Sequence, residues 1–115
     1  MIPHGVEIFV GVESIDLRWG FERLSGLVSE RIGRSARSGA LFVFRGRRGD
    51  AMKVLFFDGT GLCIFYKRLD QGTFRWPDVA SKGATSIAVD ERTLDALLDG
   101  IDVEALAKPP RTRAH

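Results

Sequence analysis

Four basic side chains surround a glycine-containing connection in the middle of this 115-residue chain. They are Arg45, Arg47, Arg48 and Lys53, with Gly46 and Gly49 among them. Guanidinium groups bind phosphate oxygens in pairs, and glycine allows a backbone to approach a polyanion closely. On a projecting β-ribbon, such groups can lie along a groove of DNA and neutralise its phosphates. The pattern therefore predicts phosphate contacts at this connection.

Further basic residues follow in the next segments of the chain. Lys67, Arg68 and Arg75 would extend the basic surface across neighbouring strands, and Trp76 would offer a ring on which a base of single-stranded nucleic acid could stack. The alternative interpretation is structural. Charged side chains at turns and on edge strands also stay in solvent and prevent unwanted strand pairing.

The charge is unevenly distributed along the sequence, although the whole chain carries only +2. Residues 31–75 hold ten basic and three acidic side chains, a net charge of +7. Residues 84–107 hold one basic and six acidic side chains, a net charge of −5. This polarity predicts that the middle of the chain, and not its C-terminal helix, faces a polyanion.

No catalytic arrangement is visible in the sequence. Asp50, Asp58 and Asp70 could be compared with a carboxylate cluster for two metals, but Asp58 and Asp70 stand beside glycines at positions typical of turns. His4 and His115 have no second ligand at metal-binding spacing. The serines have no base nearby, and no phosphate-binding loop is complete. We therefore expect no enzyme activity, no metal and no cofactor.

The elements that must position the basic residues are mainly strands. Runs of β-branched and aromatic residues are separated by glycine-containing turns, a pattern typical of strands joined by short connections. The predicted strands cover residues 7–12, 40–44, 52–57, 62–69, 73–76 and 85–89. Sequential strands with short turns predict an antiparallel meander.

Two helices complete the predicted architecture. The first follows a cap at Ser14 or Asp16 and has an apolar stripe that includes Leu24 and Val28, ending at Gly33. The second is capped by Asp90 and ends near Gly100. Its buried face is formed by Leu94, Leu97, Leu98 and Ile101. We expect a small single α+β domain over residues 3–107. Its twisted antiparallel β-meander sheet of about five to six strands is covered on one face by the two helices, and a disordered basic, proline-containing tail follows at 108–115.

Composition agrees with one globular domain in a reducing compartment. The hydrophobic content is 44%, and the single cysteine, Cys63, lies in an apolar run that favours a buried, inert thiol. The N-terminus has no signal-peptide pattern, and no apolar run approaches the length of a membrane span. These features predict a cytoplasmic bacterial protein, associated with the nucleoid if it binds DNA.

Most of residues 5–102 resembles a known family. The similarity is carried, in order, by residues 11–21, 38–50, 54–62, 65–69, 72–77 and 97–102, which include the motifs Asp58-Gly59-Thr60-Gly61, Gly72-Thr73-Phe74-Arg75-Trp76-Pro77 and Leu97-Leu98-Asp99-Gly100. The family is that of the small TnpB accessory proteins, the second reading-frame products of insertion-sequence-66 type transposons. The resemblance implies a helper of transposition that acts beside a larger transposase, and it implies no catalytic residue.

Two hypotheses follow. In the first, the chain binds DNA at transposon ends or at the target through its basic hairpin. In the second, it docks the transposase or another accessory subunit through an aromatic face of the sheet, because Phe56-Phe57 and Phe65-Tyr66 send rings to both faces unless helices cover both. A nuclease is a third and weaker alternative. The salt dependence of binding distinguishes the first two hypotheses. DNA binding weakens steeply as salt rises, because counterions are released from the DNA, whereas binding through an apolar protein interface does not.

Overall fold

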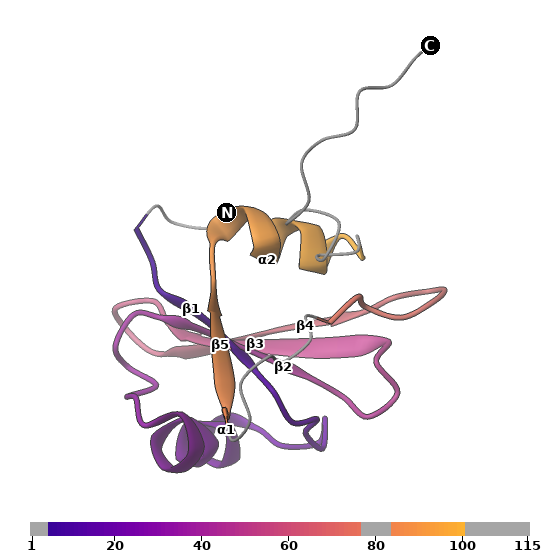
Figure 1. Ribbon diagram of the computed structural model, residues 1–115. Helices are drawn as coiled ribbons and strands as arrows, with labels where there is room; N and C mark the ends of the chain where they lie inside the picture. Colours follow the sequence, from indigo (N-terminus) through magenta and orange to yellow (C-terminus); the bar gives the residue numbers. More distant parts are fainter. Residues whose placement is uncertain (1–4, 77–83, 101–115) are drawn as a thin grey trace.

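The computed structural model describes residues 5–76 and 84–100. These residues form a five-stranded sheet in the order β4-β3-β2-β1-β5, together with helical segments on both sides of it (Figure 1). The strands are β1 (Ile8–Gly11), β2 (Leu41–Arg45), β3 (Ala51–Phe57), β4 (Leu62–Arg68) and β5 (Ser86–Val89). The prediction of a small α+β domain is confirmed.

Three consecutive strands form the predicted meander. β2 pairs antiparallel with β3, and β3 pairs antiparallel with β4 along its whole length. The turn between β3 and β4 is held by Asp58, whose Oδ1 accepts hydrogen bonds from the backbone N–H and the hydroxyl of Thr60 and from the N–H of Gly61. These bonds lower the pKa of Asp58 to about 2. Asp58 is therefore the turn-forming aspartate that its Asp-Gly pattern predicted.

The sheet is mixed, and the expectation of an antiparallel sheet is wrong at β1. Ile8 pairs with Leu41 in parallel, while on its other side β1 pairs antiparallel with β5. The connection between β1 and β2 is long and contains α1 (Phe21–Leu27), as adjacent parallel strands require. β1 therefore lies inside the sheet.

The helices lie on opposite faces of the sheet, and not on one face as expected (Figure 1). α1 continues directly into a π-helical turn, η1 (Val28–Ile32), which ends at Gly33 with φ +74° as predicted. α2 (Glu91–Leu98) covers the other face. Because side chains alternate along a strand, each inner strand supplies residues to both layers.

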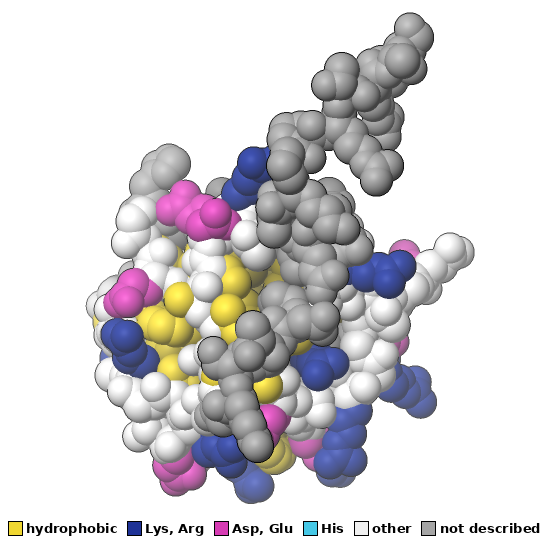
Figure 2. All heavy atoms as spheres, viewed as in Figure 1, with side chains coloured by type: hydrophobic (Ala, Val, Ile, Leu, Met, Phe, Trp, Pro, Cys, Tyr) yellow, Lys and Arg dark blue, Asp and Glu magenta, His cyan; other side chains and the backbone are white. Residues whose placement is uncertain are grey.

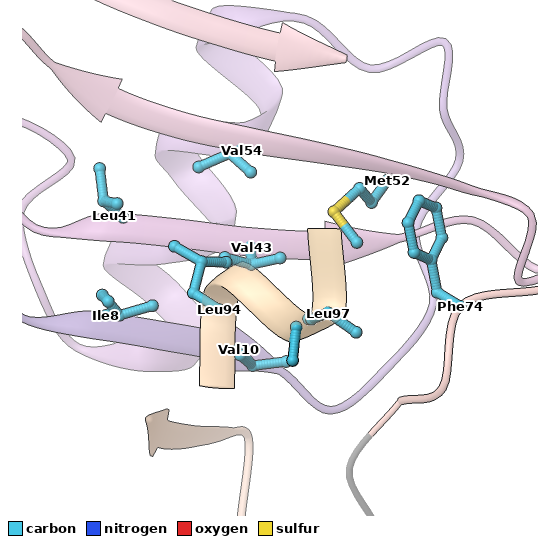
Figure 3. Close-up of a cluster of buried hydrophobic side chains, with 10 residues drawn as sticks. Ile8, Val10, Leu41, Val43, Met52, Val54, Phe74, Leu94 and Leu97 are labelled. Atoms are coloured by element: carbon cyan, nitrogen blue, oxygen red, sulfur yellow. The ribbon is translucent and has the colours of Figure 1, made fainter. Parts of the chain in front are cut away.

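Two hydrophobic cores result. The core under α2 is shown in Figure 3, where the strand side chains point toward Leu94 and Leu97. Its strand members are Ile8, Val10, Leu41, Val43, Met52 and Val54. The core under α1 contains Leu24 and Val28 packed on Phe9, Phe42, Phe44 and Leu55. Phe42 and Phe44 are buried as predicted, whereas Phe56, Phe57 and Phe65 are half-buried.

The first helix begins later than predicted. Neither Ser14 nor Asp16 caps it, since the residue before its first turn is Gly20, which has no side-chain cap. The reason is a tertiary contact. Ile15 is buried and forms a parallel bridge with Gly46, and its N–H donates to the carbonyl of Arg45 at 2.8 Å. The segment after β1 therefore runs beside the end of β2 at Ile15 and makes a turn at Leu17 and Arg18, closed by the N–H of Trp19 donating to the carbonyl of Asp16, before the helix starts.

The predicted strand at residues 73–76 is absent, because this segment packs on the sheet instead of extending it. Phe74 is buried in the core under α2, and its N–H donates to the carbonyl of Gly49. The indole Nε1 of Trp76 donates to the carbonyl of Gly11 at 3.1 Å. This packing takes the chain from the β4 side of the sheet toward β1.

The second helix agrees with its prediction. The Asp90 side chain accepts a hydrogen bond from the N–H of Thr93 at 2.7 Å, and Gly100 takes φ +78° after the last turn. Leu94 and Leu97 are buried and Leu98 is half-buried. Ile101 and the predicted tail 108–115 lie outside the described residues. No helix in the described ranges has the length and apolar content to cross a membrane.

Candidate nucleic-acid interface

The connection between β2 and β3 holds two arginines in solvent. Its ends are fixed by the N–H of Gly46, which donates to the carbonyl of Ala51, and by the N–H of Gly49, which donates to the carbonyl of Gly46. Gly49 has φ +78°, a conformation that favours glycine. Arg47 and Arg48 occupy the exposed positions of this turn. In Figure 2, Lys and Arg side chains are spread over the visible face, and several of them lie on the right, where Figure 1 shows this connection.

The bridge between Ile15 and Gly46 brings a further arginine to the same place. Leu17 packs against Gly46, so the segment that follows β1 lies directly beside the turn. Arg18, whose side chain is 90% exposed, is thereby placed next to it. The result is an open hollow of about 470 Å³, here called the arginine hollow. It is lined by Ile15, Asp16, Leu17, Arg18, Arg47, Arg48, Asp50 and Arg68.

The arginine hollow keeps a net positive charge. Its four arginines and two aspartates leave +2. Arg18 binds Asp16 through Nη2 at 2.6 Å and through Nε, and these hydrogen bonds hold the pKa of Asp16 well below its usual range. A guanidinium has five donors, so Arg18 retains further N–H groups for an anion. The hollow can therefore accept phosphate oxygens while Asp16 fixes the orientation of Arg18.

Lys53, which the sequence placed among the phosphate contacts, lies inside the protein. Its side chain is only 8% exposed, and Nζ donates to the carbonyl of Trp19 at 2.8 Å. Nζ also lies 5.2 Å from the centroid of the Tyr66 ring. The ammonium thus joins the loop before α1 to the sheet and does not face solvent.

The remaining predicted residues are not all brought together. On the α2 side of the sheet, Lys67 donates from Nζ to the carbonyl of Leu98, in the last turn of α2. Arg45 lies there too, with its guanidinium 5.9 Å from the Trp76 ring centroid. Arg68 is on the opposite face and joins Arg47 and Arg48 in the arginine hollow. Arg75 is exposed and does not line it.

An apolar groove occupies the α2 face of the sheet, at the corner that α2 leaves open. Its volume is about 560 Å³. Apolar side chains line most of it, including Val6, Leu41, Val54, Phe56, Phe65 and Leu98, and Arg37 and Asp58 also contribute. Three of the aromatic residues singled out in the sequence, Phe56, Phe57 and Phe65, therefore share one hollowed surface.

The other reactive groups do not gather into a site. Among residues 5–76 and 84–100, no three His, Cys, Asp or Glu side chains come close enough to hold a metal ion. Cys63 is half-buried rather than buried, and burial raises the pKa of its thiol.

The model of the IS66 Orf2-like protein family matches residues 6–108. The chain belongs to this family. Two relatives from Sinorhizobium fredii, both uncharacterized, match nearly end to end. Protein y4hO is 44% identical over 104 residues, which cover 89% of this chain and 88% of the relative. Protein y4jC is 31% identical over 109 residues, which cover 95% and 91%. No solved structure matches the chain.

Membership in the IS66 Orf2-like family makes this chain an accessory protein of transposition. Arg18, and Tyr66, whose hydroxyl accepts a hydrogen bond from Arg68, were not predicted from the sequence to lie at this interface; Tyr66 was predicted only on an aromatic docking face. Arg18 was missed because nothing local signals the bridge from Ile15 to Gly46. Tyr66 had a usable signal: it stands two positions before Arg68 on one strand, so the two side chains share a face.

Proposed function

We propose that this chain is a non-enzymatic accessory protein that binds DNA at the transposon ends or at the target. The observation that carries the proposal is the arginine hollow. Arg18, Arg47 and Arg48, and Arg68 come from three separate segments and converge on one open surface. Bound to DNA, the protein would lie on the nucleoid in the bacterial cytoplasm.

The chemistry of these side chains favours phosphate as the ligand. A guanidinium offers a planar set of donors that matches the oxygens of a phosphate group. Two of these exposed arginines, Arg47 and Arg48, sit on the connection of a β-hairpin, which can approach a nucleic-acid backbone without obstruction. Lys53 is left out of the proposed contacts because it is buried and its ammonium binds the Trp19 carbonyl. Lys67 is left out because it lies on the α2 face, bound to the Leu98 carbonyl, and does not line the arginine hollow.

Fluorescence anisotropy with labelled DNA across a salt series tests this proposal. The variant is Arg47→Gln with Arg48→Gln. Each phosphate contact contributes about 0.9 to the slope of log affinity against log salt on duplex DNA, so the double change is expected to reduce that slope by about 1.8. The matched control is Arg37→Gln with Arg92→Gln, which removes the same charge from exposed positions outside the arginine hollow.

The control separates local contact from net charge. We expect the control to keep the wild-type slope to within about 0.5. Equal losses in both double variants would show a nonspecific charge effect and would remove the arginine hollow from the proposal. Absence of binding to any DNA at low salt would contradict DNA binding itself.

The apolar groove favours a second candidate function, docking of the element's transposase through an apolar segment of that protein. The groove exposes rings of Phe56 and Phe65 beside Leu98, and apolar pockets of this kind accept apolar anchors. The test is a pull-down with the purified transposase of the same element, using Phe65→Gln against the control Phe21→Gln. Phe21 is 49% exposed and lies outside the groove. Loss of capture with Phe65→Gln alone, at low and high salt, is the expected result; equal capture by both variants would contradict docking here.

A further inference from the structure

Tyr66 presents an aromatic ring beside the arginine hollow. It stands in β4 and is 48% exposed, one of two large hydrophobic side chains that are exposed among the described residues. Its hydroxyl accepts a hydrogen bond from Nη2 of Arg68 at 3.0 Å, and Arg68 lines the arginine hollow. The ring and the four guanidinium groups therefore form one continuous surface.

The Tyr66 ring is held from behind. Lys53 is its cross-strand partner on β3, and the ammonium of Lys53 lies 5.2 Å from the ring centroid. Because Lys53 is only 8% exposed and is bound to the Trp19 carbonyl, the side of the ring that it contacts faces the protein. The exposed area must then belong to the outer side and edge of the ring. A buried cation behind the ring also fixes its position.

We infer that the nucleic acid taken by this surface has unpaired bases, with its phosphates in the arginine hollow and one base stacked on Tyr66. This inference rests on the proposed DNA binding and specifies the class of DNA. In a duplex the faces of the bases are covered by their neighbours, so a duplex would use only the phosphate contacts. A single strand or an opened end offers base faces for stacking as well.

Trp76, the ring that the sequence suggested for stacking, is poorly placed for it. Its Nε1 donates to the Gly11 carbonyl, and the ring is half-buried next to Arg45 on the other face of the sheet. Phe21 is as exposed as Tyr66 but lies at the start of α1, outside the arginine hollow. Among the described residues, Tyr66 is the exposed ring that shares a surface with the arginine hollow.

The test compares a labelled oligo-dT single strand with a duplex of the same length by anisotropy at fixed salt. The variants are Tyr66→Leu, which removes the ring, and Tyr66→Phe, which keeps it and removes the hydroxyl. Stacking of one base predicts that Tyr66→Leu weakens single-strand binding by about 5-fold to 150-fold while duplex binding changes less than about 2-fold. Tyr66→Phe is expected to stay near wild type on both. Circular dichroism confirms that each variant is folded.

The outcomes distinguish this inference from the proposed function. Duplex and single-strand binding that depend on Arg47 and Arg48, with Tyr66→Leu equal to wild type, would overturn the stacking and leave DNA binding in place. The same holds if Tyr66→Leu weakens both DNAs equally. If Tyr66→Phe is as weak as Tyr66→Leu, the hydroxyl and its bond to Arg68 carry the effect, and stacking is again overturned. No binding to either DNA would overturn both proposals.

Discussion

The ammonium group of Lys53 donates a hydrogen bond to the backbone carbonyl of Trp19, which lies 34 positions earlier in the chain. The bond is 2.8 Å long, and Lys53 is buried between the loop that precedes α1 and the ring of Tyr66. A buried carbonyl without a partner costs free energy, so the lysine stabilises this loop in its position against the sheet.

Lys53→Met is expected to lower the free energy of unfolding by about 1 to 3 kcal/mol, because the Trp19 carbonyl loses its donor while the packing of the stem is kept. Urea denaturation measures the change. Arg48→Met is the control, since an exposed side chain of a turn changes stability by less than about 0.5 kcal/mol. A stable Lys53→Met protein that no longer binds DNA would instead restore Lys53 as a phosphate contact.

Lys67 connects β4 to the C-terminal end of α2 through its bond to the Leu98 carbonyl. Removing it in Lys67→Met takes a cation and a donor from the helix end and is expected to destabilise α2 by about 1 kcal/mol. Amide hydrogen exchange measures this: relative to wild type, Lys67→Met is expected to accelerate exchange more in α2 than in β2. Unchanged exchange in α2 together with weaker DNA binding would show that Lys67 acts on the nucleic acid.

A Cβ added at Gly46 would lie 2.5 Å from Cδ1 and 2.9 Å from Cγ of Leu17, so the Leu17 side chain would have to move. Gly46→Ala is therefore expected to cost about 1 to 3 kcal/mol, and to cost less when Leu17→Ala is also present. Gly26→Ala is the matched control. Gly26 lies in α1 with open space around it, and the change is expected to stabilise the helix by about 0.5 to 1 kcal/mol.

The close contact at Gly46 also sets the position of Arg18. If Leu17 is displaced, the segment that carries Arg18 moves away from the turn that carries Arg47. Gly46→Ala should therefore weaken DNA binding of the folded protein, and Gly26→Ala should not. Full additivity of Gly46→Ala and Leu17→Ala in denaturation experiments would contradict the steric explanation.

Asp90 makes the stability of α2 depend on pH. Its pKa is lowered below 3.8 mainly by hydrogen bonds from Thr93. Because the pKa of Asp90 is lower in the folded state than in the unfolded state, its ionised carboxylate stabilises the fold at pH values above the unfolded-state pKa. This stabilisation is lost as the pH falls through the folded-state pKa. Asp90→Ala is expected to cost about 1 kcal/mol at pH 7, and the difference from wild type should narrow below about pH 4. Denaturation curves of wild type and Asp90→Ala at pH 7 and pH 3 measure the difference in their free energies of unfolding. An equal difference at both pH values would show that the ionised carboxylate of Asp90 is not what stabilises the start of α2.

Local patterns predicted the parts of this fold that depend on local chemistry. The turn at Asp58, the cap at Asp90 and the stop at Gly33 follow from side-chain hydrogen bonds and glycine conformations within a few residues. The burial of Lys53 had a signal as well. It stands between Met52 and Val54 in a run that is apolar on both faces, as in a strand covered on both sides.

What the sequence could not show depends on contacts between distant segments. The extended stretch around Ile15 has a helix-compatible pattern, and its bridge to Gly46 overrides that preference. The same bridge assembles the arginine hollow. Residues 73–76 alternate as a strand would, but the burial of Phe74 and the bond from Trp76 to Gly11 decide their conformation.

The position of β1 between β2 and β5 has a consequence for the order of folding. Arg45 and Met52 are partners in the β2–β3 hairpin and are seven positions apart, whereas Ile8 must meet Val89, 81 positions later in the chain. Closing the longer loop costs more chain entropy, so the hairpins from β2 to β4 are expected to form first and β5 to join last. Pulsed hydrogen exchange during refolding should then protect Val54 before Ala88. In the strand order, β5 pairs only with β1, and β1 joins the other strands through β2. If β5 paired with β1 first, β1 would still lack its partner β2. The long connection through α1 must therefore close before the sheet is complete.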